Sequence, residues 1–206
     1  KSTLLRHLVG LEQPRQGQVW LDGVDIHHGE EQALSRLRRR FGVSFQGGAL
    51  WSSMSVGENL MLPLRLFTQM PERAMAQMAE FKLALVGLQA CFHQAPATLS
   101  GGMIKRVAIA RSLMLDPEVL CLDEPDSGLD PVNAARLDAL ILSLRQNLGT
   151  TVILVTHSVA SVFAVADRAL FLDDKLHTMI ALDTPSRLLA EGPPRVREFL
   201  QRAPAT

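Results

Sequence analysis

Two short stretches decide the fold of this chain: Leu99-Ser100-Gly101-Gly102 and Val119-Leu120-Cys121-Leu122-Asp123-Glu124-Pro125. The first places a serine and two glycines at the start of an expected helix, where free backbone N–H groups can hold a phosphate. The second is an apolar strand that ends in two carboxylates, and such a pair can hold Mg²⁺ and polarise an attacking water. Together they indicate phosphate chemistry at the edge of an α/β sheet.

The chain begins with Lys1-Ser2-Thr3, which matches the last three residues of the phosphate-binding loop G-x-x-x-x-G-K-[ST]. In such a loop Lys1 reaches the β- and γ-phosphates, and the hydroxyl of Ser2 ligates Mg²⁺. Leu4, Leu5, Leu8 and Leu11 continue as the apolar stripe of a helix. We expect the glycines of the loop and the strand before it to precede Lys1, so that the chain as it stands binds ATP weakly.

The composition excludes several classes of protein. Lys plus Arg (21) equals Asp plus Glu (21), so no basic field favours nucleic acid as a partner. Cys91 and Cys121 form neither a metal-ligand spacing nor a disulfide framework, and Cys121 is expected to be a small buried apolar residue. No apolar run approaches the length of a membrane span, so a soluble, cytosolic domain is the default expectation.

Strands and helices alternate along most of the chain. Apolar runs at 18–22, 41–46 and 152–155 predict strands, and 169–173 with 178–183 predicts an antiparallel hairpin. A helix is expected to begin near Pro131 and to stop at Gly149, with an apolar face made of Leu137, Leu140, Ile141, Leu144 and Leu148. The pattern predicts an α/β core with a helical insertion between its parts.

Methionine is enriched around the expected helical insertion. Its first helix starts near Pro71, and its apolar face is predicted to comprise Ala74, Met78, Phe81 and Leu85. Met54, Met61, Met70, Met75 and Met78 are expected to fill the core, with an adaptable docking face as the alternative.

In this order, with Thr156-His157 downstream, these motifs resemble the ATPase subunit of an ABC transporter. The resemblance implies a P-loop NTPase (RecA-like) α/β fold: a mostly parallel sheet with an inserted α-helical subdomain, here lacking its N-terminal strands. It implies one ABC ATPase domain over 1–206, truncated within the phosphate-binding (Walker A) loop. The nucleotide-binding core is expected at 1–65 and 116–206, and the helical subdomain with the signature motif at 66–115.

The resemblance also assigns roles to single residues. Asp123 holds Mg²⁺ through water, Glu124 is the general base, Gln46 senses Mg²⁺ and water, and His157 contacts the γ-phosphate. Ser127-Gly128-Leu129-Asp130 matches a loop that crosses the dimer interface. Met103 departs from the glutamine most frequent in the family. The implied ligands are ATP and Mg²⁺, and the expected site comprises catalytic Glu124, His157 and Gln46; nucleotide-binding Lys1, Ser2, Thr3, Ser100, Gly101, Gly102 and Asp130; and metal-binding Ser2, Gln46 and Asp123.

The stretch from Phe45 to Leu64, Met103 and the tail 183–200 are similar to the Mce-associated (Mla-type) phospholipid transport ATPases of Gram-negative bacteria. This implies an ATPase that powers phospholipid transport between the inner and outer membranes. The implied partners are a second copy of the chain, integral-membrane permease subunits and an Mce-type lipid-binding protein, with no nucleic acid. The subunit would lie at the cytoplasmic face of the inner membrane as a peripheral protein.

Three alternatives remain open. An ABC ATPase for another solute would share every catalytic motif, so only the stretch 45–64 and Met103 argue against it. Soluble ABC proteins of translation or DNA repair carry tandem ATPase units or a long coiled-coil insertion, and a single motif set is present here. A non-catalytic regulatory remnant would be expected to have lost some of the catalytic residues.

Overall fold

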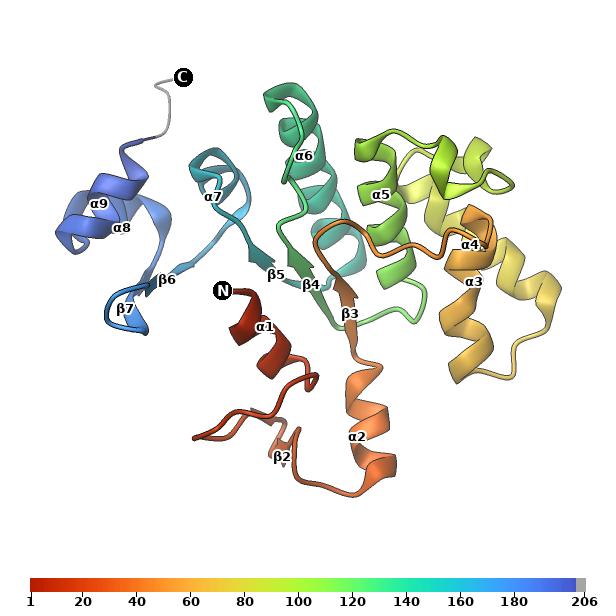
Figure 1. Ribbon diagram of the computed structural model, residues 1–206, viewed down its shortest axis with the longest axis horizontal. Helices are drawn as coiled ribbons and strands as arrows, with labels where there is room; N and C mark the ends of the chain where they lie inside the picture. Colours follow the sequence, from red (N-terminus) through yellow and green to blue (C-terminus); the bar gives the residue numbers. More distant parts are fainter. Residues whose placement is uncertain (203–206) are drawn as a thin grey trace. The chain divides into compact units, whose positions relative to one another are not determined.

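The computed structural model describes residues 1–202, which form two compact units (Figure 1). The first unit comprises Lys1–Leu129 and Leu144–Val155. The second comprises Asp130–Ser143 and the described residues from Thr156 onward. The helix α6 (Pro131–Leu148) runs from the second unit into the first.

The first unit is built around a parallel sheet in which β4 (Val119–Asp123) lies between β3 (Phe41–Ser44) and β5 (Thr151–Val155). In register, Phe41 pairs with Val119, and Asp123 pairs with Val155. Leu120, Cys121 and Leu122 are completely buried, as a continuous apolar run in a parallel sheet requires. The predicted strands are confirmed, although β3 ends at Ser44, two residues before Gln46.

Helices cover both faces of this sheet (Figure 1). On one face, Leu5 and Val9 of the segment that contains α1 (Ser2–Leu8) pack on Cys121 and its neighbours on β3 and β5. On the other face, the C-terminal end of α5 (Gly101–Ser112) lies directly against β3 at Gly42. The expected apolar stripe of α1 is wrong in part: Leu4, inside the helix, is 39% exposed, and Leu11, which lies beyond the end of the helix at Leu8, is 59% exposed.

The remaining helices of the first unit follow in chain order, and α3, α4 and α5 pack on one another. They are α2 (Glu31–Arg38), α3 (Val56–Phe67), α4 (Glu72–Leu85) and the short 3₁₀ helices η1 (Gln89–Cys91) and η2 (Pro96–Thr98). The predicted domain boundary at 65/66 falls inside α3. The group of packed helices that contains α3, α4 and α5 starts at Val56. The predicted bounds of the two domain parts stay a prediction.

The predicted apolar face of α4 is wrong. The residues of α4 that are buried are Met75, Ala79, Lys82 and Leu83, whereas Phe81 is 54% exposed. Alanine and methionine occur on both sides of this helix, so the 3.6-residue period did not identify the buried side. The true face includes a lysine, which pattern reasoning excludes from a core.

A small hairpin replaces the strand predicted at 18–22. It pairs β1 (Trp20–Leu21) with β2 (Val24–Asp25) through Asp22 and Gly23, which have φ of 49° and 77°. Asp-Gly is the preferred sequence for a two-residue hairpin turn with positive φ at both positions, so the turn could have been predicted.

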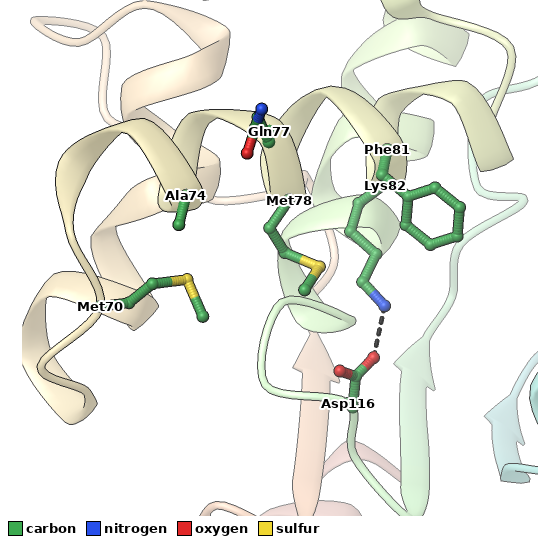
Figure 2. A pocket seen from close by; sticks show the side chains of 7 residues that line it. All are labelled: Met70, Ala74, Gln77, Met78, Phe81, Lys82 and Asp116. Atoms are coloured by element: carbon green, nitrogen blue, oxygen red, sulfur yellow. Dashed lines mark hydrogen bonds and ion pairs between the residues drawn. The ribbon is translucent and has the colours of Figure 1, made fainter.

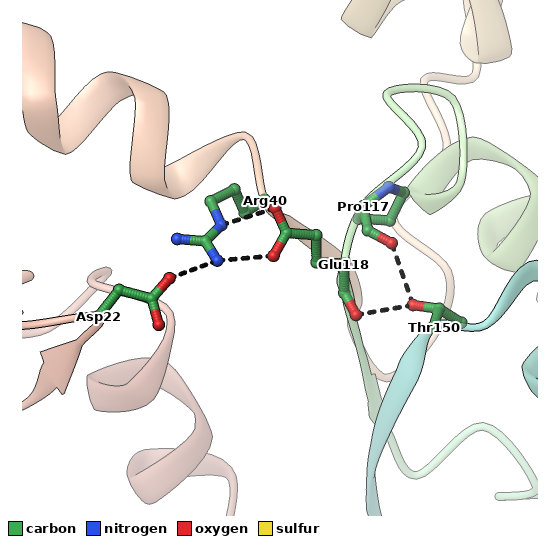
Figure 3. Close-up of polar contacts among 5 residues, drawn as sticks. All are labelled: Asp22, Arg40, Pro117, Glu118 and Thr150. Atoms are coloured by element: carbon green, nitrogen blue, oxygen red, sulfur yellow. Dashed lines mark hydrogen bonds and ion pairs between the residues drawn. The ribbon is translucent and has the colours of Figure 1, made fainter.

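Arg40 ties this hairpin to the amino end of the sheet (Figure 3). Its Nε and Nη2 atoms donate to Glu118 at 2.9 and 2.6 Å, and Nη2 lies 2.6 Å from Oδ2 of Asp22. These carboxylates raise the pKa of the Arg40 guanidinium. The Thr150 hydroxyl, just before β5, lies 3.0 Å from the carbonyl of Pro117 and 3.1 Å from that of Glu118.

The second unit contains the predicted hairpin, β6 (Ala169–Asp173) with β7 (Thr178–Asp183), and the prediction is confirmed in its bounds. Its helices are α7 (Val159–Val165), α8 (Pro185–Glu191) and α9 (Pro194–Leu200). A core of Val159, Ala169, Leu188, Val196 and Leu200 holds them together.

The long helix α6 also agrees with the sequence. It ends one residue before Gly149, whose φ is 65°, and Leu137, Ile141 and Leu144 are buried as predicted. Leu148, at the end of the expected face, is 37% exposed. No helix within residues 1–202 combines the length and the apolar character that crossing a membrane requires.

The close approach of α5 to β3 predicts that Gly42→Ala destabilises the protein. A Cβ at this position would overlap the backbone carbonyl of Ser112 and lie 2.8 Å from Cγ of Pro117. Overpacking of this kind costs about 1–3 kcal/mol. We expect a lower midpoint of thermal unfolding, by roughly 2–4 °C per kcal/mol for a chain of this size.

Gly29→Ala is the matched control, because the nearest atom to its Cβ would be the movable Cδ2 of Leu34 at 3.3 Å. Equal midpoints for the two variants would contradict the close packing of α5 on β3.

Candidate active site

The carboxyl end of β4 carries the two acidic residues singled out by the sequence. Asp123 is 5% exposed, and its Oδ1 accepts a hydrogen bond from the hydroxyl of Ser2 at 2.9 Å. Packing of Leu5 on Cys121 holds α1 against β4, and this places the first turn of α1 beside the end of the strand. Burial raises the pKa of the Cys121 thiol to about 12, so this cysteine is a protonated core residue, as expected.

Glu124 turns away from the line of β4. Its φ is 47°, an uncommon value for a residue with a side chain, and its N–H donates to the carbonyl of Val155 at 2.8 Å. Its Oε2 accepts a hydrogen bond from Nε2 of Gln46 at 3.1 Å. The backbone conformation therefore separates the two adjacent carboxylates, so that one faces Ser2 and the other faces Gln46.

Gln46 lies at the start of a loop with unusual backbone geometry. Gly47, Gly48 and Ala49 all have positive φ, at 83°, 80° and 45°. Arg111 of α5 fixes this loop by donating to the carbonyls of Gly48 and Ala49 at 2.9 and 2.7 Å. Sequence reasoning did not identify Arg111 as a functional residue, and the signal for it was indirect: a Gly-Gly turn exposes carbonyls that need a donor.

The stretch Ser100–Gly102 forms the beginning of α5. Ser100 is the N-cap, and its Oγ accepts from the N–H of Met103 at 3.3 Å, so the change from glutamine keeps this backbone donor. A Cβ at Gly101 would meet no atom within 4 Å, which leaves open space at this end of the helix. A Cβ at Gly102 would lie 3.7 Å from Leu129, in the loop that follows Glu124.

The structure thus brings together four of the predicted site residues in two pairs, Ser2 with Asp123 and Gln46 with Glu124. Lys1 is the N-cap of α1, and Thr3 lies exposed in its first turn. His157 and Asp130 belong to the second unit, where His157 is exposed and Asp130 directly precedes α6. The roles of all these residues stay predictions.

The two oxygen atoms of the Ser2–Asp123 pair fit a small divalent cation. Mg²⁺ prefers oxygen ligands and is held by one or two protein groups together with waters and substrate phosphates. Among residues 1–202, no group of three or more His, Cys, Asp or Glu side chains is placed to hold a metal ion. Any Mg²⁺ at this edge would therefore need waters or phosphate oxygens among its remaining ligands.

A separate pocket lies on α4, where the wrongly predicted apolar face is open (Figure 2). At its edge Lys82, which is 2% exposed, forms an ion pair with Asp116. The pocket offers apolar surface and no nucleophile paired with a base, and it is lined by Met70, Ala74, Gln77, Met78, Phe81, Lys82 and Asp116.

Acidic side chains at the carboxyl edge of a parallel sheet, beside a Lys-Ser-Thr helix start, define the class of P-loop NTPases. A family model described as "ABC transporter" matches residues 1–127, and a shorter one described as an AAA domain matches residues 93–162. Because the first match covers more than half of the chain, the chain belongs to the ABC transporter family and is an ABC ATPase domain. The resemblance inferred from the motifs is confirmed.

Relatives support the same assignment. The chain is 38% identical over 200 residues to "Intermembrane phospholipid transport system ATP-binding protein MlaF" of Escherichia coli K12, covering 97% of this chain and 74% of that protein. It is 40% identical over 200 residues to "Probable ribonucleotide transport ATP-binding protein mkl" of Mycobacterium tuberculosis H37Rv, covering 97% of this chain. The chain spans 55% of the length of that second relative.

Solved structures confirm the fold class. The cassette cbiO1 from Clostridium perfringens, part of the ABC transporter complex cbiONQ, matches with a TM-score of 0.81 and 28% identity, covering 98% of this chain and 79% of that one. The ATP-binding cassette MJ0796, in a dimeric post-hydrolysis state bound to ADP and Pi, matches with a TM-score of 0.79 and 28% identity, covering 89% and 79%.

The N-cap geometry of Asp130 predicts a pH-dependent contribution to stability. Its carboxylate accepts from the N–H groups of Val132 and Asn133, both at 3.1 Å, and from Nδ2 of Asn133. These hydrogen bonds hold the pKa of the Asp130 carboxyl below its usual 3.8. The stabilisation is therefore complete above pH 3.8 and is lost as the pH falls through the lower folded-state pKa.

We expect Asp130→Ala to lower the urea midpoint at pH 7, and we expect its difference from the parent to shrink below about pH 3.8. Glu80→Ala, at an exposed position of α4, removes a carboxylate that has no capping role and serves as the control. A difference that stays constant into the acid range would show that the carboxylate charge at Asp130 does not matter.

Proposed function

We propose that the full-length protein hydrolyses ATP and thereby powers phospholipid transport between the two membranes of a Gram-negative bacterium. The observation that carries the ATPase proposal is the paired geometry at the end of β4: Ser2 with Asp123 at 2.9 Å and Gln46 with Glu124 at 3.1 Å. This arrangement separates a cation-binding pair from a base, as phosphoryl transfer to water requires.

Each residue of the proposed site would have its own role in hydrolysis. Ser2 and Asp123 hold Mg²⁺, which neutralises developing charge on the phosphate oxygens when it is bound. Glu124 accepts the proton of the attacking water as the water oxygen bonds to the γ-phosphorus and ADP leaves with the bond electrons. Gln46 keeps the Glu124 carboxylate in place. Lys1, Thr3 and His157 bind the phosphates.

The start of α5 would act on the nucleotide of a second copy of the chain. The space at Gly101 and the N-cap at Ser100 leave the positive end of the helix accessible to a phosphate. Asp130 and the loop before it would lie at the dimer interface. The dimeric cassettes among the solved structures support this proposal.

The proposed lipid cargo is supported by the MlaF relatives and by the stretch from Phe45 to Leu64. The proposed partners are integral-membrane permease subunits and an Mce-type lipid-binding protein, with the ATPase peripheral on the cytoplasmic face of the inner membrane. An ABC ATPase for another solute is the second candidate, because the mkl relatives are named for ribonucleotide transport. A soluble ABC protein is the weaker candidate, because MlaF and mkl are both named for transport.

Glu124→Gln tests the catalytic proposal. The amide cannot accept the proton of the attacking water, so we expect ATP hydrolysis to fall by roughly 10²–10⁴-fold. ATP binding should persist, because glutamine keeps the shape of the side chain. Phosphate release and nucleotide binding by the full-length protein measure the two quantities separately.

In the same variant, size-exclusion chromatography should show an ATP-dependent dimer that Ser100→Trp abolishes. Glu80→Gln is the control carboxylate change on the exposed side of α4. Normal hydrolysis by Glu124→Gln would contradict its role as the base, and an ATP-bound monomer would contradict the shared site.

The cargo proposal is tested in vesicles that contain the full-length protein and its permease. We expect ATP-dependent transfer of a fluorescent phospholipid, lost in the Glu124→Gln complex, because only a hydrolysing subunit can reset the transporter. Radiolabelled ribonucleotide is the competing substrate in a parallel assay. Ribonucleotide transport without lipid transfer would overturn the phospholipid proposal and leave the ATPase proposal intact.

A further inference from the structure

Lys105 joins two segments of the first unit that the catalytic proposal treats separately. It lies in the second turn of α5, the helix that begins at Ser100, and it is half-buried. Its ammonium donates a hydrogen bond to the carbonyl of Ser127, in the loop that follows Glu124. The start of α5 and the segment after the proposed base are therefore directly connected.

The loop that receives this hydrogen bond is closed on Glu124 itself. The N–H of Ser127 donates to the carbonyl of Glu124 at 3.2 Å, and the N–H of Leu129 donates to that of Asp126 at 3.1 Å. A Cβ at Gly102 would lie 3.7 Å from Leu129, which is a second close approach between α5 and this loop. A displacement of α5 near Gly102 would thus move this loop and, through it, the backbone of Glu124.

The charges around Lys105 favour the same contact. Burial lowers the pKa of its ammonium, and the carboxylates of Asp126 and Glu124 oppose that shift by stabilising the charged form. Asp126 is itself buried, at 8% exposure. The contact that holds the Lys105 ammonium in place is its hydrogen bond to the carbonyl of Ser127, and this contact exists only while the loop keeps its position.

The backbone of Glu124 needs such support. A residue with a side chain at φ of 47° is held in this conformation by its surroundings. Val155 fixes its N–H and Gln46 fixes its carboxylate, but both act on Glu124 from the side of β5 and the glutamine loop. Lys105 instead holds the segment that follows Glu124 in the chain, through its hydrogen bond to Ser127.

We propose that Lys105 is a positioning residue that couples the phosphate-binding start of α5 to Glu124 of the same chain. This inference rests on the proposed ATPase function. If the start of α5 contacts the nucleotide of a second copy, Lys105 links occupancy of that site to the base of the other site. The two ATP sites of a dimer would then communicate through each chain.

The test compares Lys105→Met, Lys105→Arg and Lys175→Met in the full-length protein. Lys105→Met is expected to lower kcat for ATP hydrolysis by about 10–100-fold, the effect of a misplaced catalytic group, with KM unchanged. The Hill coefficient for ATP is expected to fall toward about 1, because the coupling between sites is lost. Lys105→Arg keeps a charged donor and should recover both values in part.

Lys175→Met is the matched control, since Lys175 is exposed in the turn between β6 and β7 of the second unit. Hydrogen exchange at the amides of Ser127 and Leu129, measured without nucleotide, gives a readout that does not depend on activity. Faster exchange in Lys105→Met, with normal exchange in Lys175→Met, is expected.

The outcomes separate the two proposals. Unchanged exchange at Ser127 and Leu129 overturns the role of Lys105, whether or not the parent protein hydrolyses ATP. Faster exchange with unchanged kcat and Hill coefficient in an active protein overturns the coupling. A parent protein with no ATPase activity overturns the proposed function and, with it, the coupling, even where the exchange result shows that Lys105 holds the loop.

Discussion

The burial of β4 between β3 and β5 is the constraint on which the rest of the first unit depends. Leu120, Cys121 and Leu122 have no exposed surface, so the strand has one register and one depth in the sheet. Its last residue, Asp123, therefore emerges at a fixed point on the carboxyl edge. A one-residue slip would exchange the faces of the strand and move both carboxylates, which is incompatible with the core formed around Cys121.

The helix α5 packs on the sheet and holds the loops around its carboxyl edge through hydrogen bonds. Gly42 allows its end to lie against β3, and Arg111 and Lys105 then reach two different loops from two different turns. Both hydrogen-bond to backbone carbonyls, so these interactions fix the course of the chain itself. Helix and sheet thus act as one scaffold that positions the loops at the carboxyl edge.

The sequence predicted the parts of this structure that depend on local pattern. The apolar run of β4, the hairpin at 169–173 and 178–183 and the stop at Gly149 each have a signal within a few residues. The buried face of α4 was missed because Lys82 is buried by an ion pair with Asp116, 34 residues away in the chain. Lys105 and Arg111 continue the family's pattern after Ser100–Gly102, but the sequence assigned them no role, because their partners are backbone carbonyls far away in the chain.

The site shows the same contrast between what a local motif predicts and what distant contacts determine. Motif spacing identified Asp123 and Glu124, and the alternation of side chains along an extended strand suggested two distinct roles for them. The structure separates the two carboxylates differently, because φ of 47° at Glu124 takes this residue out of the extended conformation and directs it to Gln46, while Asp123 stays with Ser2. That conformation costs free energy, which the contacts of β5, the glutamine loop and α5 must offset together. A proposed base that is held by three separate segments is sensitive to the position of each one, so a ligand bound at the start of α5 would be able to influence it.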